Sequence, residues 1–171
     1  MDVSKSVVQS LRHARHDFLN ELQLIGMYLD LGQPEKAKAM IRSHAEAAVH
    51  MSRLAGLGMP MTEEWLLLSK WRYPELAIQT ECTAEAGIAK LDGAFAGMLE
   101  KFAETVRPQM DPFVEYVCTI SIWNENESLA MKISLNGDWQ GLQLPESSLD
   151  TAVIKCGSDG LEVAVRPQME G

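Results

Sequence analysis

The sequence predicts an α+β protein in which a long N-terminal helical hairpin, residues 1–58, precedes a small α/β domain, residues 59–171. Two observations carry this prediction. Apolar residues recur every three or four positions through the first part, which is the spacing of one helix face, whereas the second part mixes such segments with β-rich, alternating ones. The formal charge also differs, because it is +1 over residues 1–58 and −10 over residues 59–171. The two parts are therefore expected to be separate structural units with different partners.

Composition excludes several classes of protein. With 171 residues, of which 46% are hydrophobic and 23% charged, the chain can fill a core, which excludes a disordered, fibrous or disulfide-stapled protein. A net charge of −9 argues against nucleic acid as a partner, because phosphate recognition needs a basic face. We find no apolar window long enough for a membrane span and no apolar N-terminal signal. The three cysteines form no CxxC motif and are expected to be free thiols of a cytoplasmic protein.

The first part should form two antiparallel helices over residues 3–31 and 34–57, each about 40 Å long for a helical rise of about 1.5 Å per residue. Gly32 suits the position past a helix C-terminus, Pro34 suits the first turn of the next helix, and Gly58 ends the second helix. A lone hairpin leaves its apolar stripe in water, so we expect two hairpins to pair around a two-fold axis, as a homodimeric four-helix bundle. The residues expected in its core are Leu11, Phe18, Leu22, Ile25, Ala48 and Met51.

The second part should be a small sheet with helices on one side. Helices are expected over residues 62–71, 91–106 and 145–151, and strands over residues 73–82, 113–123, 128–135, 152–156 and 160–165. Thr62 is the expected N-cap of the first of these helices, and Trp65, Leu66 and Leu68 are expected on its buried face. The polar segment 124–127 should join two of the strands as a β-hairpin.

The densest polar cluster lies midway along the first helix. Its members are three or four residues apart and therefore share one outward face. They are His13, His16, Asp17, Asn20 and Glu21, with Arg12 and Arg15 beside them. An exposed imidazole is mostly neutral at pH 7 and can accept a phosphoryl group on one ring nitrogen. In that chemistry Asp17 would orient His16 or take its proton, and Asn20 would hydrogen-bond the phosphoryl oxygens.

Two other interpretations of this cluster stay open at this point. A polar face on an amphipathic helix is most often simply solvated. The other alternative is a metal site, formed by His13 and His16 with Asp17 or His44 as a third ligand. His44 otherwise falls on the apolar seam of the second helix, where we expect it to pack in the core, and His50 is expected at the surface.

The residues around the cluster resemble a known histidine motif. Residues 11–25 run L-R-H-A-R-H-D-F-L-N-E-L-Q-L-I, and residues 32–37 follow as G-Q-P-E-K-A. This pattern resembles the histidine box of the sporulation initiation phosphotransferase B family, which also occurs in the dimerisation domains of citrate- and fumarate-sensing histidine kinases. The resemblance covers about the first 57 residues and implies that His16 is the phosphorylated residue. It further implies a dimeric four-helix bundle followed by a small α/β sandwich that resembles a degenerate histidine-kinase ATPase domain.

The resemblance implies a phosphorelay phosphotransferase that carries a phosphoryl group between the aspartates of two response-regulator receiver domains, in the initiation of sporulation. The regulators would be received by Arg12, His13, Arg15 and Glu21. They would bring their own Mg²⁺, so this chain is expected to bind no cofactor or metal itself. Glu21 departs from the pattern, because a basic residue is common at its position in the family.

An ATP-using histidine kinase is not expected, because the glycine-rich motifs of its nucleotide site are missing. The pairs Asp92-Gly93, Gly137-Asp138 and Asp159-Gly160 each lack a second glycine at the required spacing. The alternative from another functional class is a non-catalytic dimeric adaptor, or a kinase-regulating module, in which the histidine is a relic.

Overall fold

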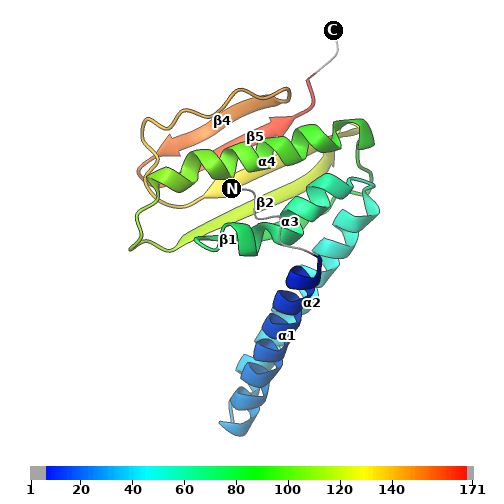
Figure 1. Cartoon of the computed structure of the whole chain (residues 1–171), viewed down its shortest axis with the longest axis vertical. Coiled ribbons are helices and arrows are strands. Elements are labelled where there is room, and N and C mark those ends of the chain that lie inside the picture. Colours follow the sequence, from blue (N-terminus) through cyan, green and yellow to red (C-terminus); the bar gives the residue numbers. More distant parts are fainter. Residues whose placement is uncertain (1–6, 169–171) are drawn as a thin grey trace. The chain divides into compact units, whose positions relative to one another are not determined.

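The computed structural model describes residues 7–168, and it divides between Ala48 and Val49 into two compact units. The N-terminal unit is helical, and the C-terminal unit combines helices with a five-stranded sheet (Figure 1). The sequence placed the boundary between residues 58 and 59. In the structure it falls inside the second helix, because Leu54 and Leu57 near the end of that helix are buried in the core of the C-terminal unit.

The predicted hairpin is present, with its first helix and most of its second helix in the N-terminal unit. Helix α1 spans Val7–Asp30 and helix α2 spans Pro34–Gly56, which confirms both helices, although residues 3–6 of the first prediction lie outside the described residues. The turn between them depends on Gly32, whose φ of +66° is a left-handed conformation that favours glycine. The Gln33 backbone N–H then donates to the Tyr28 carbonyl oxygen at 2.8 Å, which gives one of the last carbonyl groups of α1 a hydrogen-bond partner. Helix α2 begins at the next residue, Pro34.

The apolar stripe of the hairpin lies at the surface of the single chain. Leu11, Phe18 and Leu22 are about half or more exposed, at 64%, 58% and 48%, and Ala48 is exposed as well. Ile25 is half-buried. Apolar side chains stabilise a fold only when they are removed from water, so this stripe is an exposed hydrophobic surface that nothing in the single chain covers among the described residues.

The C-terminal unit packs two helices, α3 (Pro60–Arg72) and α4 (Asp92–Val106), on one face of a sheet (Figure 1). This confirms the small sheet with helices on one side. The strands, in chain order, are β1 (Leu76–Cys82), β2 (Tyr116–Glu125), β3 (Ser128–Leu135), β4 (Asp150–Gly157) and β5 (Gly160–Arg166). They lie in the order β1-β2-β3-β5-β4, with β1 parallel to β2 and the other neighbours antiparallel. Two short 3₁₀ helices, η1 (Ala89–Leu91) and η2 (Arg107–Gln109), flank α4.

The core of this unit lies between the helices and the sheet. Phe95 and Phe102 project from α4 toward it, and both are at most 2% exposed. From the sheet, Ile120 and Ile133 occupy paired positions on β2 and β3 and are likewise buried. The alternation that predicted the strands thus corresponds to one face packed on the helices.

The predicted hairpin of the sheet is confirmed, with a tighter turn. Asn126 and Glu127 have φ values of +49° and +62°, as a two-residue turn between right-twisted strands requires. Asn124 and Glu125, expected in the loop, instead belong to β2 and pair with Leu129 and Ser128. The carboxamide oxygen of Asn124 also accepts the backbone N–H of Glu85 at 2.7 Å, so this side chain ties a separate loop to the end of the strand.

Three local predictions were wrong. Residues 145–151 do not form a helix: Ser147 Oγ accepts the Leu149 N–H at 3.0 Å, a local bond that competes with helix formation, and β4 begins at Asp150. Thr62 is not the N-cap of α3, because the helix starts two residues earlier and Met59 occupies that position. Leu68 is only half-buried, whereas Trp65 and Leu66 are buried as expected.

Candidate functional site

His16 lies midway along α1, and its side chain is 75% exposed. One turn further on, the Asn20 carboxamide nitrogen Nδ2 lies 3.1 Å from the Nδ1 atom of the imidazole. The Asp17 carboxylate oxygen Oδ1 lies 4.0 Å from the same nitrogen. Both contacts are made at Nδ1, so the ring is held from one side while its body stays open to solvent. A ring in this setting is accessible to a large partner.

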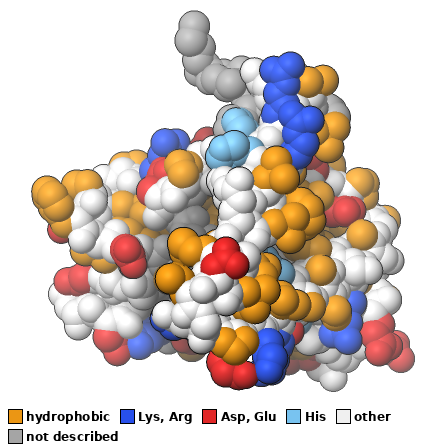
Figure 2. Space-filling model, turned by 90° about the horizontal axis from the view of Figure 1, so that it is seen from below, with side chains coloured by type: hydrophobic (Ala, Val, Ile, Leu, Met, Phe, Trp, Pro, Cys, Tyr) orange, Lys and Arg blue, Asp and Glu red, His pale blue; other side chains and the backbone are white. Residues whose placement is uncertain are grey.

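Basic side chains accompany His16 along the helix. Arg12, His13 and Arg15 are all exposed. Figure 2 shows histidine, basic and hydrophobic side chains at the surface within one view of the molecule. Positive charge around an exposed imidazole favours the approach of an anionic group and of an acidic protein surface.

Asp17 and Glu21 are half-buried, so they lie at the inner edge of the cluster. Glu21 Oε2 lies 3.6 Å from Nδ1 of His44 on α2, which connects the two helices beside the cluster. In the single chain the His44 side chain is 43% exposed and faces a carboxylate, so its packing in the core of a dimeric bundle stays a prediction. Sequence spacing could suggest the contact between Asn20 and His16, four residues apart, but not a pair that joins two helices.

His50 also differs from its prediction. It is half-buried, and its Nδ1 lies 3.2 Å from the backbone nitrogen and 3.1 Å from the carbonyl oxygen of Cys82. This histidine thus fastens the last turns of α2 to the end of β1 within the C-terminal unit. It is separate from the cluster on α1.

The metal-site interpretation gains no support from the described residues. Among residues 7–168, no three His, Cys, Asp or Glu side chains form a group that could hold a metal ion. The described helices also include none with the length and apolar character needed to cross a membrane.

The three aspartate-glycine pairs considered for a nucleotide site have their carboxylates engaged elsewhere. Asp92 accepts the backbone N–H groups of Met61 and Thr62, both at 2.8 Å. Asp138 accepts the Gln140 N–H at 3.1 Å, and Asp159 pairs with Lys155 at 2.8 Å. The ion pair lowers the pKa of the Asp159 carboxyl below its ordinary value, chiefly through the hydrogen bond from Lys155. Each carboxylate therefore has a structural contact within the fold.

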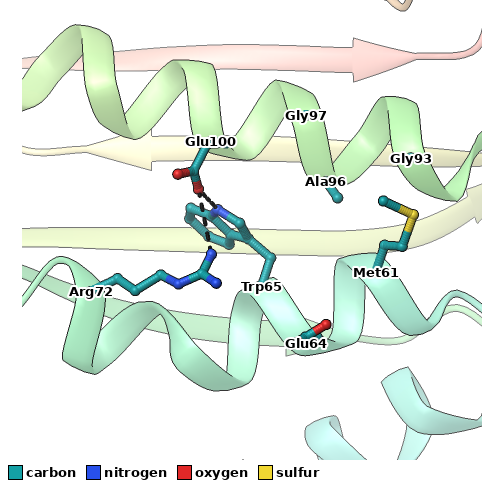
Figure 3. A pocket seen from close by; sticks show the side chains of 8 residues that line it. All are labelled: Met61, Glu64, Trp65, Arg72, Gly93, Ala96, Gly97 and Glu100. Carbon is teal, nitrogen blue, oxygen red and sulfur yellow. Dashed lines mark hydrogen bonds and ion pairs between the residues drawn. The ribbon is translucent and has the colours of Figure 1, made fainter. Parts of the chain in front are cut away.

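A shallow groove runs between α3 and α4 (Figure 3). On the α4 side the groove is lined by small residues, which are Gly93, Ala96 and Gly97, and on the α3 side it is bordered by Met61. At one end Glu100 accepts the indole N–H of Trp65 and lies 3.9 Å from an Arg72 nitrogen.

The polar groups at this end of the groove are hydrogen-bonded or ion-paired with one another. Burial first, and then a hydrogen bond with Glu100, raises the pKa of the neighbouring Tyr73 hydroxyl above its ordinary value. Glu100 therefore serves as the common partner of Trp65, Arg72 and Tyr73, and it supports the packing of α4 on α3.

An exposed histidine thus lies on a long helical hairpin, and a separate α/β unit follows the hairpin in the chain. Residues 1–57 match the family model of the SpoOB-type sensor kinase, alpha-helical domain. The chain is also 24% identical over 149 residues to sporulation initiation phosphotransferase B of Bacillus subtilis (strain 168), covering 86% of this chain and 77% of that protein. The N-terminal part of the chain thus resembles the SpoOB-type helical domain, and the similarity to this relative extends over most of the chain.

Proposed function

We propose that this chain is a cytoplasmic phosphorelay histidine phosphotransferase, which moves a phosphoryl group between the aspartates of two response regulators through phosphohistidine at His16. The observation that carries the proposal is the exposed His16 ring, held at Nδ1 beside Asn20 and Asp17. It lies within the segment that matches the SpoOB-type model. Similarity to a protein named sporulation initiation phosphotransferase B supports a role in starting sporulation.

The proposed reaction needs little more than position and charge. An imidazole lone pair attacks the phosphorus of an aspartyl phosphate, the P–N bond forms, and the P–O bond breaks with its electrons going to the aspartate carboxylate. The second regulator reverses the step, so nothing is consumed besides the transferred group. Arg12 and Arg15 would draw the acidic regulator surface toward the helix, and Glu21 would limit that attraction at one edge. Mg²⁺ carried by the regulator would neutralise charge at the phosphoryl oxygens.

We further propose that the protein is a homodimer in which two hairpins form a four-helix bundle. The exposed Leu11, Phe18 and Leu22 support this proposal, because a second copy would remove them from water. Sedimentation should give a mass of about twice 19.0 kDa. Leu22→Glu, which introduces a charge into the stripe, should shift the protein to the monomer, whereas Lys38→Gln on the exposed surface of α2 should leave it dimeric. A wild-type monomer at micromolar concentration would contradict the dimer.

In this proposal the C-terminal unit is a degenerate ATPase domain that no longer binds nucleotide. The structural contacts of Asp92 support this, since both oxygens of its buried carboxylate already accept hydrogen bonds from α3. A thermal-shift titration with Mg-ATP should therefore leave the unfolding temperature unchanged. A saturable rise in that temperature would instead favour an ATP-using kinase.

The transfer itself is tested with a receiver domain that carries a radiolabelled aspartyl phosphate. Wild type should acquire label that is stable to base and labile to acid, as phosphohistidine is. His16→Gln should stay at background, and Lys38→Gln should label as wild type does. Equal labelling of wild type and His16→Gln would refute the assignment of His16. Absence of label in wild type, with retained binding of the receiver, would favour a non-catalytic adaptor.

A further inference from the structure

The groove between α3 and α4 is a surface that the proposed function does not use. It has a volume of about 300 Å³ and lies within the C-terminal unit (Figure 3). Ala96 and Trp65, which line it, are 9% and 5% exposed. Met61, at the end away from Glu100, is apolar and yet 56% exposed. The groove therefore offers apolar surface that a partner can remove from water.

Gly97 is the residue of this groove that the chain's own fold does not explain. It lies in the interior of α4, where glycine is the least favourable residue after proline. Its backbone is not in the left-handed region. Apart from its chain neighbours and its own helix backbone, no described residue has a heavy atom within 4 Å of a Cβ added there. A glycine that the fold itself does not require is expected where a surface from outside the chain approaches the helix closely.

The charge of the groove indicates what kind of side chain approaches it. Of the three charged residues that line it, Arg72 and Glu100 pair with each other at one end, at 3.9 Å. Glu64 is exposed, and among residues 7–168 no hydrogen bond or ion pair engages its carboxylate. The uncompensated charge is therefore negative, in a part of the chain, residues 59–171, whose formal charge is −10. A basic side chain complements both.

We propose that this groove is the docking site of a helix from a partner protein that bears a lysine or arginine side chain. A third helix fits a groove between two others, because its side chains pack between theirs, and Gly97 lets its backbone come close. The aliphatic stem of the basic residue would lie along the groove, and its charge would reach Glu64. From Gly93 to Glu100 the groove follows about two turns of α4, enough for a short helical contact. The site is independent of the phosphoryl chemistry proposed for the N-terminal unit.

The test uses the full-length, ¹⁵N-labelled protein and a helical peptide probe of roughly 15 residues, the length at which an isolated helix becomes stable in water. The probe consists of alanine, leucine and arginine, and a matched control peptide has glutamate in place of arginine. Binding is followed at the amide signals of Gly93 and Gly97, which are identified by their loss in Gly93→Ala and Gly97→Ala. The arginine peptide should shift both signals saturably, and the glutamate peptide should leave them unchanged.

Two variants test the groove itself, with binding followed at the Gly93 signal. Gly97→Leu should weaken binding of the arginine peptide about tenfold or more, because the new side chain occupies the space that the peptide needs. The protein should stay folded, since leucine favours a helix more than glycine does. Glu64→Gln removes the uncompensated charge and should weaken binding about two- to fivefold, the effect of one exposed ion pair. Glu85→Gln, the same change at an exposed position outside α3 and α4, should leave the affinity unchanged.

Weaker binding in both groove variants, with Glu85→Gln equal to wild type, supports the inference. It would be overturned if the arginine peptide shifted neither glycine signal at millimolar concentration, if the glutamate peptide shifted them equally, or if Gly97→Leu bound as wild type does. A shift of the Gly97 signal with protein concentration alone, without peptide, would show that a second copy covers the groove, and would also overturn it.

Discussion

The side chain of Asp92 gives the sharpest test of how the C-terminal unit is held together. It begins α4, is 5% exposed, and accepts three hydrogen bonds from the first turn of α3. The donors are the Met61 N–H and Thr62 N–H, both at 2.8 Å, and the Thr62 hydroxyl at 2.7 Å. Met59, at the N-cap position of α3, provides no side-chain acceptor, so Asp92 does from a distance what an N-cap residue does locally.

Replacing Asp92 by alanine removes all three acceptor contacts and leaves the Thr62 N–H without a partner in a buried site and the Met61 N–H without one in a part-buried site. Each unsatisfied buried donor costs about 1–3 kcal/mol, so we expect the free energy of unfolding to fall by about 3–4 kcal/mol. Asp92→Asn keeps one oxygen but loses the charge that favours a helix N-terminus, and should cost about 1–2 kcal/mol. Glu85→Ala, at an exposed carboxylate, should change stability by less than about 0.5 kcal/mol.

Urea unfolding followed by tryptophan fluorescence measures this directly, because all four tryptophans of the chain lie in the C-terminal unit. A double-mutant cycle with Thr62→Val should show coupling of about 1 kcal/mol or more between the two side chains. The reasoning would be refuted by an Asp92→Ala variant as stable as Glu85→Ala. Additive effects of Asp92→Ala and Thr62→Val would refute the hydrogen bond between the side chains.

Three further predictions concern the same unit. Leu54→Ala, at a fully buried position, should lower the free energy of unfolding by about 3 kcal/mol in urea titrations, while Leu67→Ala, at a side chain 46% exposed, should lower it by less than about 1 kcal/mol. A thiol reagent should modify the exposed Cys156 in the native protein and leave the buried Cys82 and Cys118 unmodified until urea is added, so early modification of all three would contradict the core. Burial raises the pKa of the Cys118 thiol from its ordinary 9.0 to about 12, so above about pH 9 the folded state keeps a proton that the unfolded chain releases. The free energy of unfolding linked to this thiol is therefore complete below about pH 9 and declines by about 1.4 kcal/mol per pH unit above it. In urea titrations between about pH 9 and 11, Cys118→Ala should lose correspondingly less stability with rising pH than wild type.

The helices and most strands followed from local pattern. The Gly32 turn, the helical spacing through α1 and α2, and the alternation along β2 and β3 are properties of short stretches of chain, so they could be found without knowing what packs against what. The failed helix over residues 145–151 shows the limit of that approach. Its residues can form a helix, but the hydrogen bond from the Leu149 N–H to the Ser147 hydroxyl oxygen and the pairing of β4 with β5 favour an extended backbone at the end of this segment.

The candidate site divides in the same way. Sequence alone placed His16, Asp17 and Asn20 on one helix face, because residues three or four apart on a helix must be neighbours. The sequence also predicted an outward face, and His16 is exposed in the structure, whereas the choice of Nδ1 as the contact atom came from the structure alone. The same is true of Glu21 facing His44, which lies on another helix.

Periodicity and turn residues determined the helical hairpin and the histidine face of this protein, since both depend only on neighbours in the chain. Tertiary structure alone decided that Asp92 caps α3, that His50 binds the end of β1, and that the sheet runs β1-β2-β3-β5-β4. These contacts join residues about thirty or more positions apart, or order strands across the whole unit. The free energy of such contacts depends on which surfaces are buried together, and no local pattern encodes that choice.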